Sequence, residues 1–71
     1  MNGSVYRVTE VIGTSSESWE AAAAHAVATA AGSVRDLRVA EVMRQDVTIE
    51  NGVITSYRVR LGLSFKYETG D

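Results

Sequence analysis

The stretch that decides the fold runs from Ile49 to Tyr67 and reads IENGVITSYRVRLGLSFKY. Its Asn51-Gly52 pair is a strong signal for a two-residue β-hairpin, because both central positions of such a turn require a positive φ. The residues after the turn alternate between two sets, as in a strand with one buried face, so we predict a strand over Val53–Tyr67. One face would carry Val53, Thr55, Tyr57, Val59, Leu61, Leu63, Phe65 and Tyr67. The other would carry Ile54, Ser56, Arg58, Arg60, Gly62, Ser64 and Lys66.

A second long strand is predicted on the other side of the turn, over Leu37–Ile49. Its apolar residues do not keep one parity. Val39, Met43, Val47 and Ile49 share one face, whereas Ala40 and Val42 fall on the other. Either both faces of this strand lose water, or a β-bulge changes the parity midway.

A helix is predicted upstream, from about Ser16 to Ala31. Apolar residues recur there at helical spacing and form one stripe, made of Trp19, Ala22, Ala23, Ala26, Val27 and Ala30. Thr14 with Glu17 fits a capping box, and Ser15 is an equally plausible N-cap. Gly32 is a natural end for the helix. Trp19 could offer a stacking platform, but its place at the start of the stripe favours core packing.

The first strand is predicted over Ser4–Ile12, and Gly13-Thr14-Ser15-Ser16 is expected to end it. Strands joined through a helix in one sheet are normally parallel, and the hairpin makes the third strand antiparallel to the second. The simplest arrangement is an α+β subunit of β-α-β-β order, with a three-stranded antiparallel-type sheet in the order 1-3-2 around one helix.

One thin helix cannot cover three long strands, so apolar sheet surface is left for partner chains. The chain has 71 residues, enough for a single domain over 1–71. A domain of this size buries only about 60% of its unfolded surface, and without cysteine no disulfide can compensate. We therefore expect obligate self-association.

Composition excludes several classes of function. The formal net charge is −2, which gives no general attraction to nucleic acid or to anionic membranes. No apolar run approaches the ~20 residues of a membrane span. No basic segment precedes an apolar one at the N-terminus, so we expect a cytoplasmic protein. With no cysteine and only His25, a thiol nucleophile, a catalytic triad or a zinc site within one chain is not expected, and we predict no enzymatic activity.

Taken together, four segments resemble the dodecin family: YRVTEVIGTS from Tyr6, SSESWEAA from Ser15, VAEV from Val39 followed by Gln45, and SYRVRLGLSF from Ser56. The resemblance spans nearly the whole chain. It implies β-α-β-β subunits that assemble into a hollow homododecamer with cubic 23 symmetry. It also implies a non-enzymatic protein, because flavin-binding dodecins store or sequester flavins at two-fold interfaces.

The residues that resemble the flavin clamp are altered in this chain. Where flavin-binding members have a stacking tryptophan on the second strand, this sequence has Val39, and where they have a glutamine on the third strand, it has Arg58. Glu41 and Gln45 still match. Valine offers no aromatic face, and arginine donates hydrogen bonds but cannot accept them. The chain is thus more similar to the branch without the stacking tryptophan, which includes calcium dodecins.

The ligand stays open at this stage. The resemblance implies binding or storage of a small molecule or ion, with a residual weak flavin site or a calcium site as alternatives. Carboxylates could hold calcium only where chains meet, since no linear calcium motif is present; the candidates are Glu17, Glu41, Asp46 and Glu50. His25 is predicted to be a surface or interface residue rather than a ligand. Arg58, Arg60 and Lys66 would form either an anion-binding wall or ion pairs with Glu41, Asp46 or Glu10.

Overall fold

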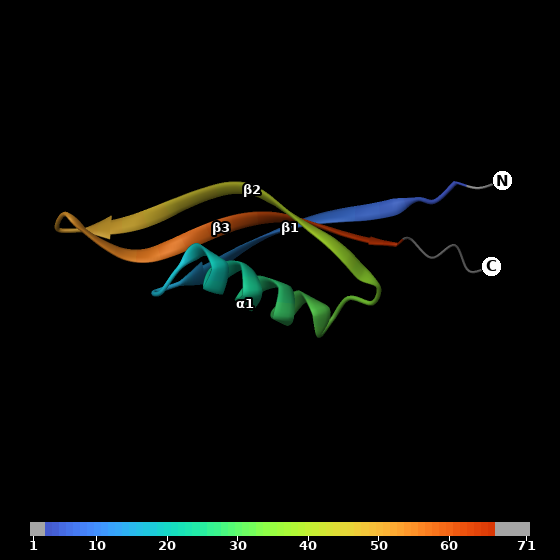
Figure 1. The fold of residues 1–71 in the computed structure, drawn as a ribbon, viewed down its shortest axis with the longest axis horizontal. Coiled ribbons are helices and arrows are strands. Elements are labelled where there is room, and N and C mark those ends of the chain that lie inside the picture. The colour runs from blue at the N-terminus through green and yellow to red at the C-terminus, as the bar shows by residue number, and fades with distance from the viewer. Residues whose placement is uncertain (1–2, 67–71) are drawn as a thin grey trace.

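A computed structural model describes residues 3–66 and confirms the predicted α+β architecture (Figure 1). The order of elements is β-α-β-β, with the bounds β1 Tyr6–Ser15, α1 Trp19–Ala31, β2 Leu37–Glu50 and β3 Val53–Lys66. The sheet has the predicted order β1-β3-β2, and both neighbouring pairs are antiparallel. β1 and β2 therefore run parallel to each other on either side of β3. Tyr67, the predicted end of the third strand, lies outside the described residues.

The helix packs against one face of the sheet, and the predicted apolar stripe is the face that it buries. Ala22 of α1 is fully buried against the sheet, and Val59, Leu61 and Leu63 of β3 are buried beside it. Their partly buried neighbours include all other members of the stripe: Trp19, Ala23, Ala26, Val27 and Ala30. Small side chains let the helix approach the sheet closely, so its alanine-rich face packs directly against the sheet.

Gly13 explains how the helix comes so close to β1. A Cβ atom built on Gly13 would clash with the backbone oxygen of Ala22 and would lie 2.9 Å from the Cβ of Ala26. Gly13 is therefore an interior residue of β1, and its lack of a side chain lets α1 pack closely against the strand. The prediction that Gly13 and the three residues after it end the first strand was wrong: β1 starts later than expected and continues to Ser15.

The start of the helix also differs from the prediction. Ser18 is the N-cap, and its side chain accepts a hydrogen bond from the backbone N–H of Ala21 at 3.0 Å. Ser15 instead accepts a hydrogen bond from the N–H of Glu17, so neither Thr14 nor Ser15 caps the helix. Each of these hydroxyl residues could cap a helix, and the longer β1 decides which one does. The expected end at Gly32 is confirmed.

The hairpin is as predicted. Asn51 and Gly52 have φ values of 52° and 77°, the positive pair that a type I′ turn requires. Close to the turn, Thr48 lies 2.7 Å from the hydroxyls of both Thr55 and Ser56, which ties the two strands together. In Figure 1 the hairpin extends well beyond the N-terminal end of the helix.

Irregular pairing in β2 resolves the mixed parity of its sequence. The pairing with β3 shifts between Leu37 and Val39 and again between Val42 and Arg44, so Arg38 and Met43 are extra residues without partners. Of the two alternatives, the β-bulge is the one that the structure shows. After the second bulge, the side-chain parity of the strand is reversed.

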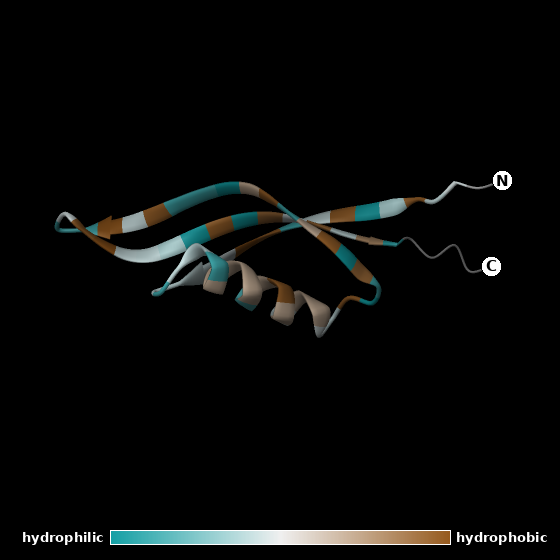
Figure 2. Ribbon diagram, viewed as in Figure 1, coloured by the Kyte–Doolittle hydropathy of each residue, from teal (hydrophilic) through white to brown (hydrophobic). Residues whose placement is uncertain are grey.

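The described chain is long and thin, with principal extents of 56 × 20 × 13 Å. Its radius of gyration is 14.9 Å, whereas a compact domain of this length has about 11 Å. Apolar segments occur on all three strands, including parts that no helix covers (Figure 2). Among residues 3–66, the one helix lacks the length and hydrophobicity that crossing a bilayer requires.

Candidate functional site

The sheet face opposite the helix, called the bare face below, carries the candidate functional residues. Directly paired residues of antiparallel strands share a face, so the register assigns this face without ambiguity. Its central residues are Val8, Glu10 and Ile12 of β1, Val39, Glu41, Arg44 and Asp46 of β2, and Arg58, Arg60, Gly62 and Ser64 of β3.

One end of the bare face is apolar. Val8 and Val39 both pair with Ser64, so they flank it from the two outer strands. Met43 lies over Gly62: a Cβ on that glycine would be 3.2 Å from the Met43 sulfur and 3.8 Å from Val8 Cγ1. Val8, Val39 and Met43, the Val8 patch, are 63%, 56% and 48% exposed. Such a cluster on a sheet without a second layer is a surface suited to a partner.

The middle of the bare face is charged. Arg58 donates to both carboxylate oxygens of Asp46, from Nε at 2.8 Å and from Nη2 at 3.1 Å. Arg60 makes a longer contact of 3.6 Å with Glu10. Asp46 and Glu10, two of the three carboxylates predicted as ion-pair partners, therefore form their pairs within one subunit. Arg44 stands directly opposite Arg60 in the pairing of β2 with β3.

The bidentate pair changes the titration of both partners. The hydrogen bond from Arg58 lowers the pKa of Asp46 below its ordinary value of 3.8, aided by the charges of Arg58, Arg44 and Arg60, while partial desolvation opposes the shift. The same hydrogen bond raises the pKa of Arg58. Asp46 is thus an anion at neutral pH that already has its counter-ion.

Trp19 packs in the core, as the stripe predicted. Its indole N–H donates to the backbone oxygen of Asp46 at 3.0 Å, and its ring meets Tyr57 edge to face at a centroid distance of 5.2 Å. Asp46 therefore links both faces of the sheet: its backbone oxygen holds the start of the helix, and its side chain holds Arg58 on the bare face.

The four predicted ligand residues do not meet within one subunit. Val39, Glu41 and Arg58 lie on the bare face, but Gln45 pairs with Val59 and is on the helix side. Val39 pairs with Ser64, six positions along β3 from Arg58, or roughly 20 Å at the strand rise. A site containing both would have to draw them from different copies of the chain.

The residue that sequence analysis missed is Arg44. Plain alternation along β2 places it on the side of Val42, toward the helix, and the extra residue Met43 moves it to the bare face. The signal was present in the sequence as the parity conflict of β2, but the conflict does not say which residue is the extra one.

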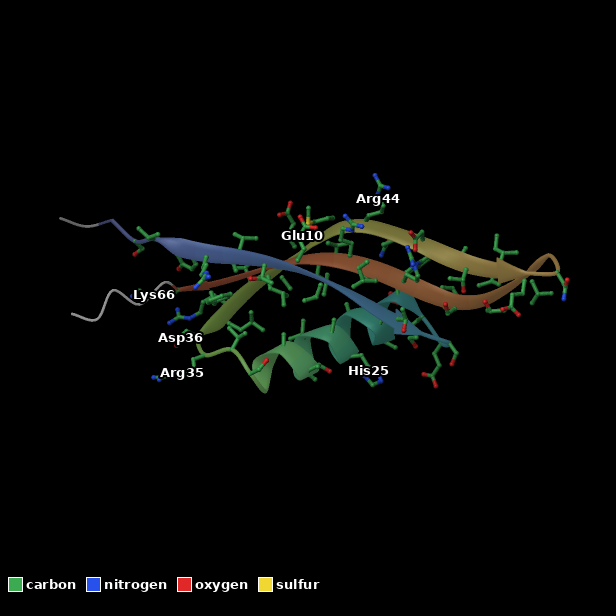
Figure 3. The ribbon with its side chains drawn as sticks, turned by 180° about the vertical axis from the view of Figure 1, so that it is seen from behind. Glu10, His25, Arg35, Asp36, Arg44 and Lys66 are labelled. Atoms are coloured by element: carbon green, nitrogen blue, oxygen red, sulfur yellow. The ribbon has the colours of Figure 1, made fainter. Side chains whose placement is uncertain are left out.

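Residues 3–66 hold no cluster of three or more histidine or acidic side chains suited to a metal ion. A separate groove of about 620 Å³ lies between the helix and β1, with Val11, Ala30 and Leu63 among its lining residues and His25 at its rim. His25 is exposed, and in Figure 3 it points away from the sheet.

Comparison with known proteins places this geometry in a family. The sequence model of dodecin matches residues 5–68. The chain belongs to the dodecin family. Calcium dodecin of Mycobacterium tuberculosis is 51% identical over 63 residues, which is 89% of each chain.

Solved dodecins share the fold over their full length. Dodecin from Streptomyces coelicolor superposes with a TM-score of 0.90 at 37% identity, covering 99% of this chain and 100% of its own. The crystal structure of M. tuberculosis calcium dodecin, a calcium-chelating antigen with a calcium-binding site, gives a TM-score of 0.80 at 49% identity, covering 96% and 97%. Dodecin neighbours support self-association of this chain.

Proposed function

We propose that the chain is a single-domain, non-enzymatic subunit of a closed homo-oligomeric shell that binds, stores or sequesters a small ligand. The observation that carries the proposal is the uncovered sheet face with the Val8 patch at its apolar end. Twelve copies are the number that the family resemblance supplies, and a closed shell of them would bury the Val8 patch of the bare face.

The flavin clamp is proposed to be weakened. Val39 is 56% exposed and aliphatic, so it offers an edge of the ligand site but no stacking surface. Arg58 is engaged with Asp46 through two hydrogen bonds, which leaves fewer of its donors for a ring. Both features disfavour tight flavin binding even if copies bring the two residues together.

Fluorescence titration tests this reading of the clamp. Riboflavin is titrated with the assembled protein, and we expect little quenching at sub-micromolar protein. Val39→Trp combined with Arg58→Gln restores the residues of flavin-binding members and should raise the affinity by about tenfold or more, from stacking and two-way hydrogen bonding. Strong quenching by the unmodified chain would refute the proposal that its flavin binding is weakened.

Calcium is the second candidate ligand, supported by the similarity to calcium dodecin. Because the described part of one chain forms no carboxylate cluster, the site would lie where subunits meet. Calorimetric titration of the chelator-treated protein with calcium tests whether it binds calcium. Heat that saturates, together with a raised melting temperature, supports calcium binding; no heat and no change in stability remove it.

A further inference from the structure

A second site on the bare face is defined by arginines that oppose each other. Arg44 and Arg60 are direct cross-strand partners, with Cβ atoms at about 4.5–5.5 Å in this kind of pairing. Like charges in that position destabilise a sheet. In Figure 3, Arg44 and Glu10 project from the side of the sheet opposite the helix.

The bulge at Met43 creates this opposition. Without the extra residue, Arg44 would pair with Val59 and point toward the helix, and Met43 would face Arg60. Bulges often re-aim a side chain next to a functional site. The sheet is therefore built so that two cations stand together, although a regular strand would have separated them.

The neighbouring carboxylates do not cancel these charges equally. Arg58 is held by Asp46 through short bidentate bonds, the strongest arrangement for such a pair. Within residues 3–66, Arg60 has the single 3.6 Å contact with Glu10, and both side chains are about half exposed, so solvent screens this contact. Arg44 has no carboxylate within 4 Å among residues 3–66. Glu41, the third carboxylate of the bare face, forms no ion pair within 4 Å among residues 3–66, so Arg44 is the arginine of this face that lacks a direct counter-ion.

A small hollow lies between these groups. It measures about 70 Å³ and is lined by Ile12, Arg44, Asp46, Arg58 and Arg60. The size suits a compact oxyanion and excludes a whole nucleotide. We propose that Arg44 and Arg60 together bind the phosphate group of a small molecule, or free inorganic phosphate, at this hollow.

Phosphate matches the site chemically because its oxygens can accept from two guanidinium groups at once. The same chemistry could come from a carboxylate of a neighbouring copy, which would then bridge subunits. We assign the site to phosphate, and the experiment below distinguishes phosphate from a neighbour's carboxylate. The assignment does not depend on whether flavin or calcium binds.

The test is a calorimetric titration of the assembled protein with inorganic phosphate at low ionic strength. Arg44→Gln should lower the affinity at least about tenfold, the effect of one charge-assisted hydrogen bond. Arg35→Gln is the matched control: it removes the same charge in the exposed loop before β2, away from the bare face, and should leave binding unchanged (Figure 3).

A second variant moves the affinity in the opposite direction. Glu10→Gln releases Arg60 and should tighten phosphate binding, whereas Glu50→Gln at the hairpin, with the same change in charge, should not. Equal phosphate binding by Arg44→Gln and the unmodified chain would overturn the proposal. A second combination of results would also overturn it: the unmodified protein gives no heat with phosphate, and Arg44→Gln fails to assemble. That combination would mean that Arg44 and Arg60 bind a carboxylate of a neighbouring subunit. Either failure leaves the shell proposal standing.

Discussion

The two faces of the sheet are built from similar residues but have opposite environments. On the helix side, Val59, Leu61 and Leu63 are 1–2% exposed. On the bare face, Val8 and Val39 are 63% and 56% exposed. The difference shows that one helix completes only half of the core, and that the other half must come from outside the subunit. The substitutions below test this contrast, from the largest expected effect to the smallest.

Leu61→Ala should have the largest effect, because it opens a cavity in the covered face. Removing a fully buried leucine side chain costs about 2–5 kcal/mol of unfolding free energy. Urea unfolding at fixed protein concentration measures the loss. Ile54→Ala on the same strand, where the side chain is 50% exposed, is the control and should cost less than about 1 kcal/mol. Equal losses would mean that burial under the helix does not decide the cost of losing a β3 side chain.

Gly13→Ala tests the close approach of helix and β1 on the covered face. The added methyl meets the backbone of Ala22, so the helix must shift, and overpacking of this kind costs about 1–3 kcal/mol. Thermal unfolding reports the change. Gly3→Ala, where a Cβ meets nothing within 4 Å, should be neutral. An unchanged melting temperature in Gly13→Ala would show that the packing is looser than the structure indicates.

Val8→Ser probes the bare face and should act on assembly rather than on the subunit fold. Burying a valine contributes about 1.5 kcal/mol or more, so the dissociation constant between subunits should rise roughly tenfold. Analytical ultracentrifugation over a dilution series measures it, with far-UV circular dichroism confirming the fold. If dissociation is unaffected, the Val8 patch is not part of an interface.

Arg58→Gln should have the smallest effect, and that effect depends on pH. The pKa of Asp46 is lower in the folded protein than its ordinary 3.8, so on acidification the unfolded chain takes up the proton first. The ion pair therefore stabilises the fold above pH ~4 and this contribution is lost as the pH falls through the folded pKa. Urea midpoints of both proteins should differ at pH 7 and converge as the pH falls below the folded pKa of Asp46. A difference that does not narrow would contradict the assigned pairing.

Much of the fold could be predicted from local signals. Asn51-Gly52 and the stripe beginning at Trp19 each depend on neighbours in sequence, and each was confirmed. The alternation of β3 was confirmed from Ser56 to Lys66, but the shift in pairing between Thr48 and Ile49 leaves Thr55 without a partner and reverses the predicted faces of Val53 and Ile54. The helix start was not predictable in the same way. Several hydroxyl residues precede the helix, and the choice of Ser18 depends on how far β1 continues past Gly13, which is a tertiary contact with Ala22.

The site was less accessible from sequence because it depends on register. The mixed parity of β2 left open whether both faces lose water or a bulge is present, and it could not locate the extra residue, so Arg44 was assigned to no face. Gln45 fell on the helix side for the same reason. The distance between Val39 and Arg58 shows a further limit, since residues that act together across copies need not be neighbours in one chain.

The central claim is that the apolar end of the bare face, with the Val8 patch, is covered by sister subunits. Multi-angle light scattering of the purified chain, diluted stepwise toward nanomolar concentration, tests it directly. The account predicts a single large particle whose mass is a multiple of the subunit, with twelve as the expected multiple. A folded, cooperatively unfolding monomer across that range would contradict it.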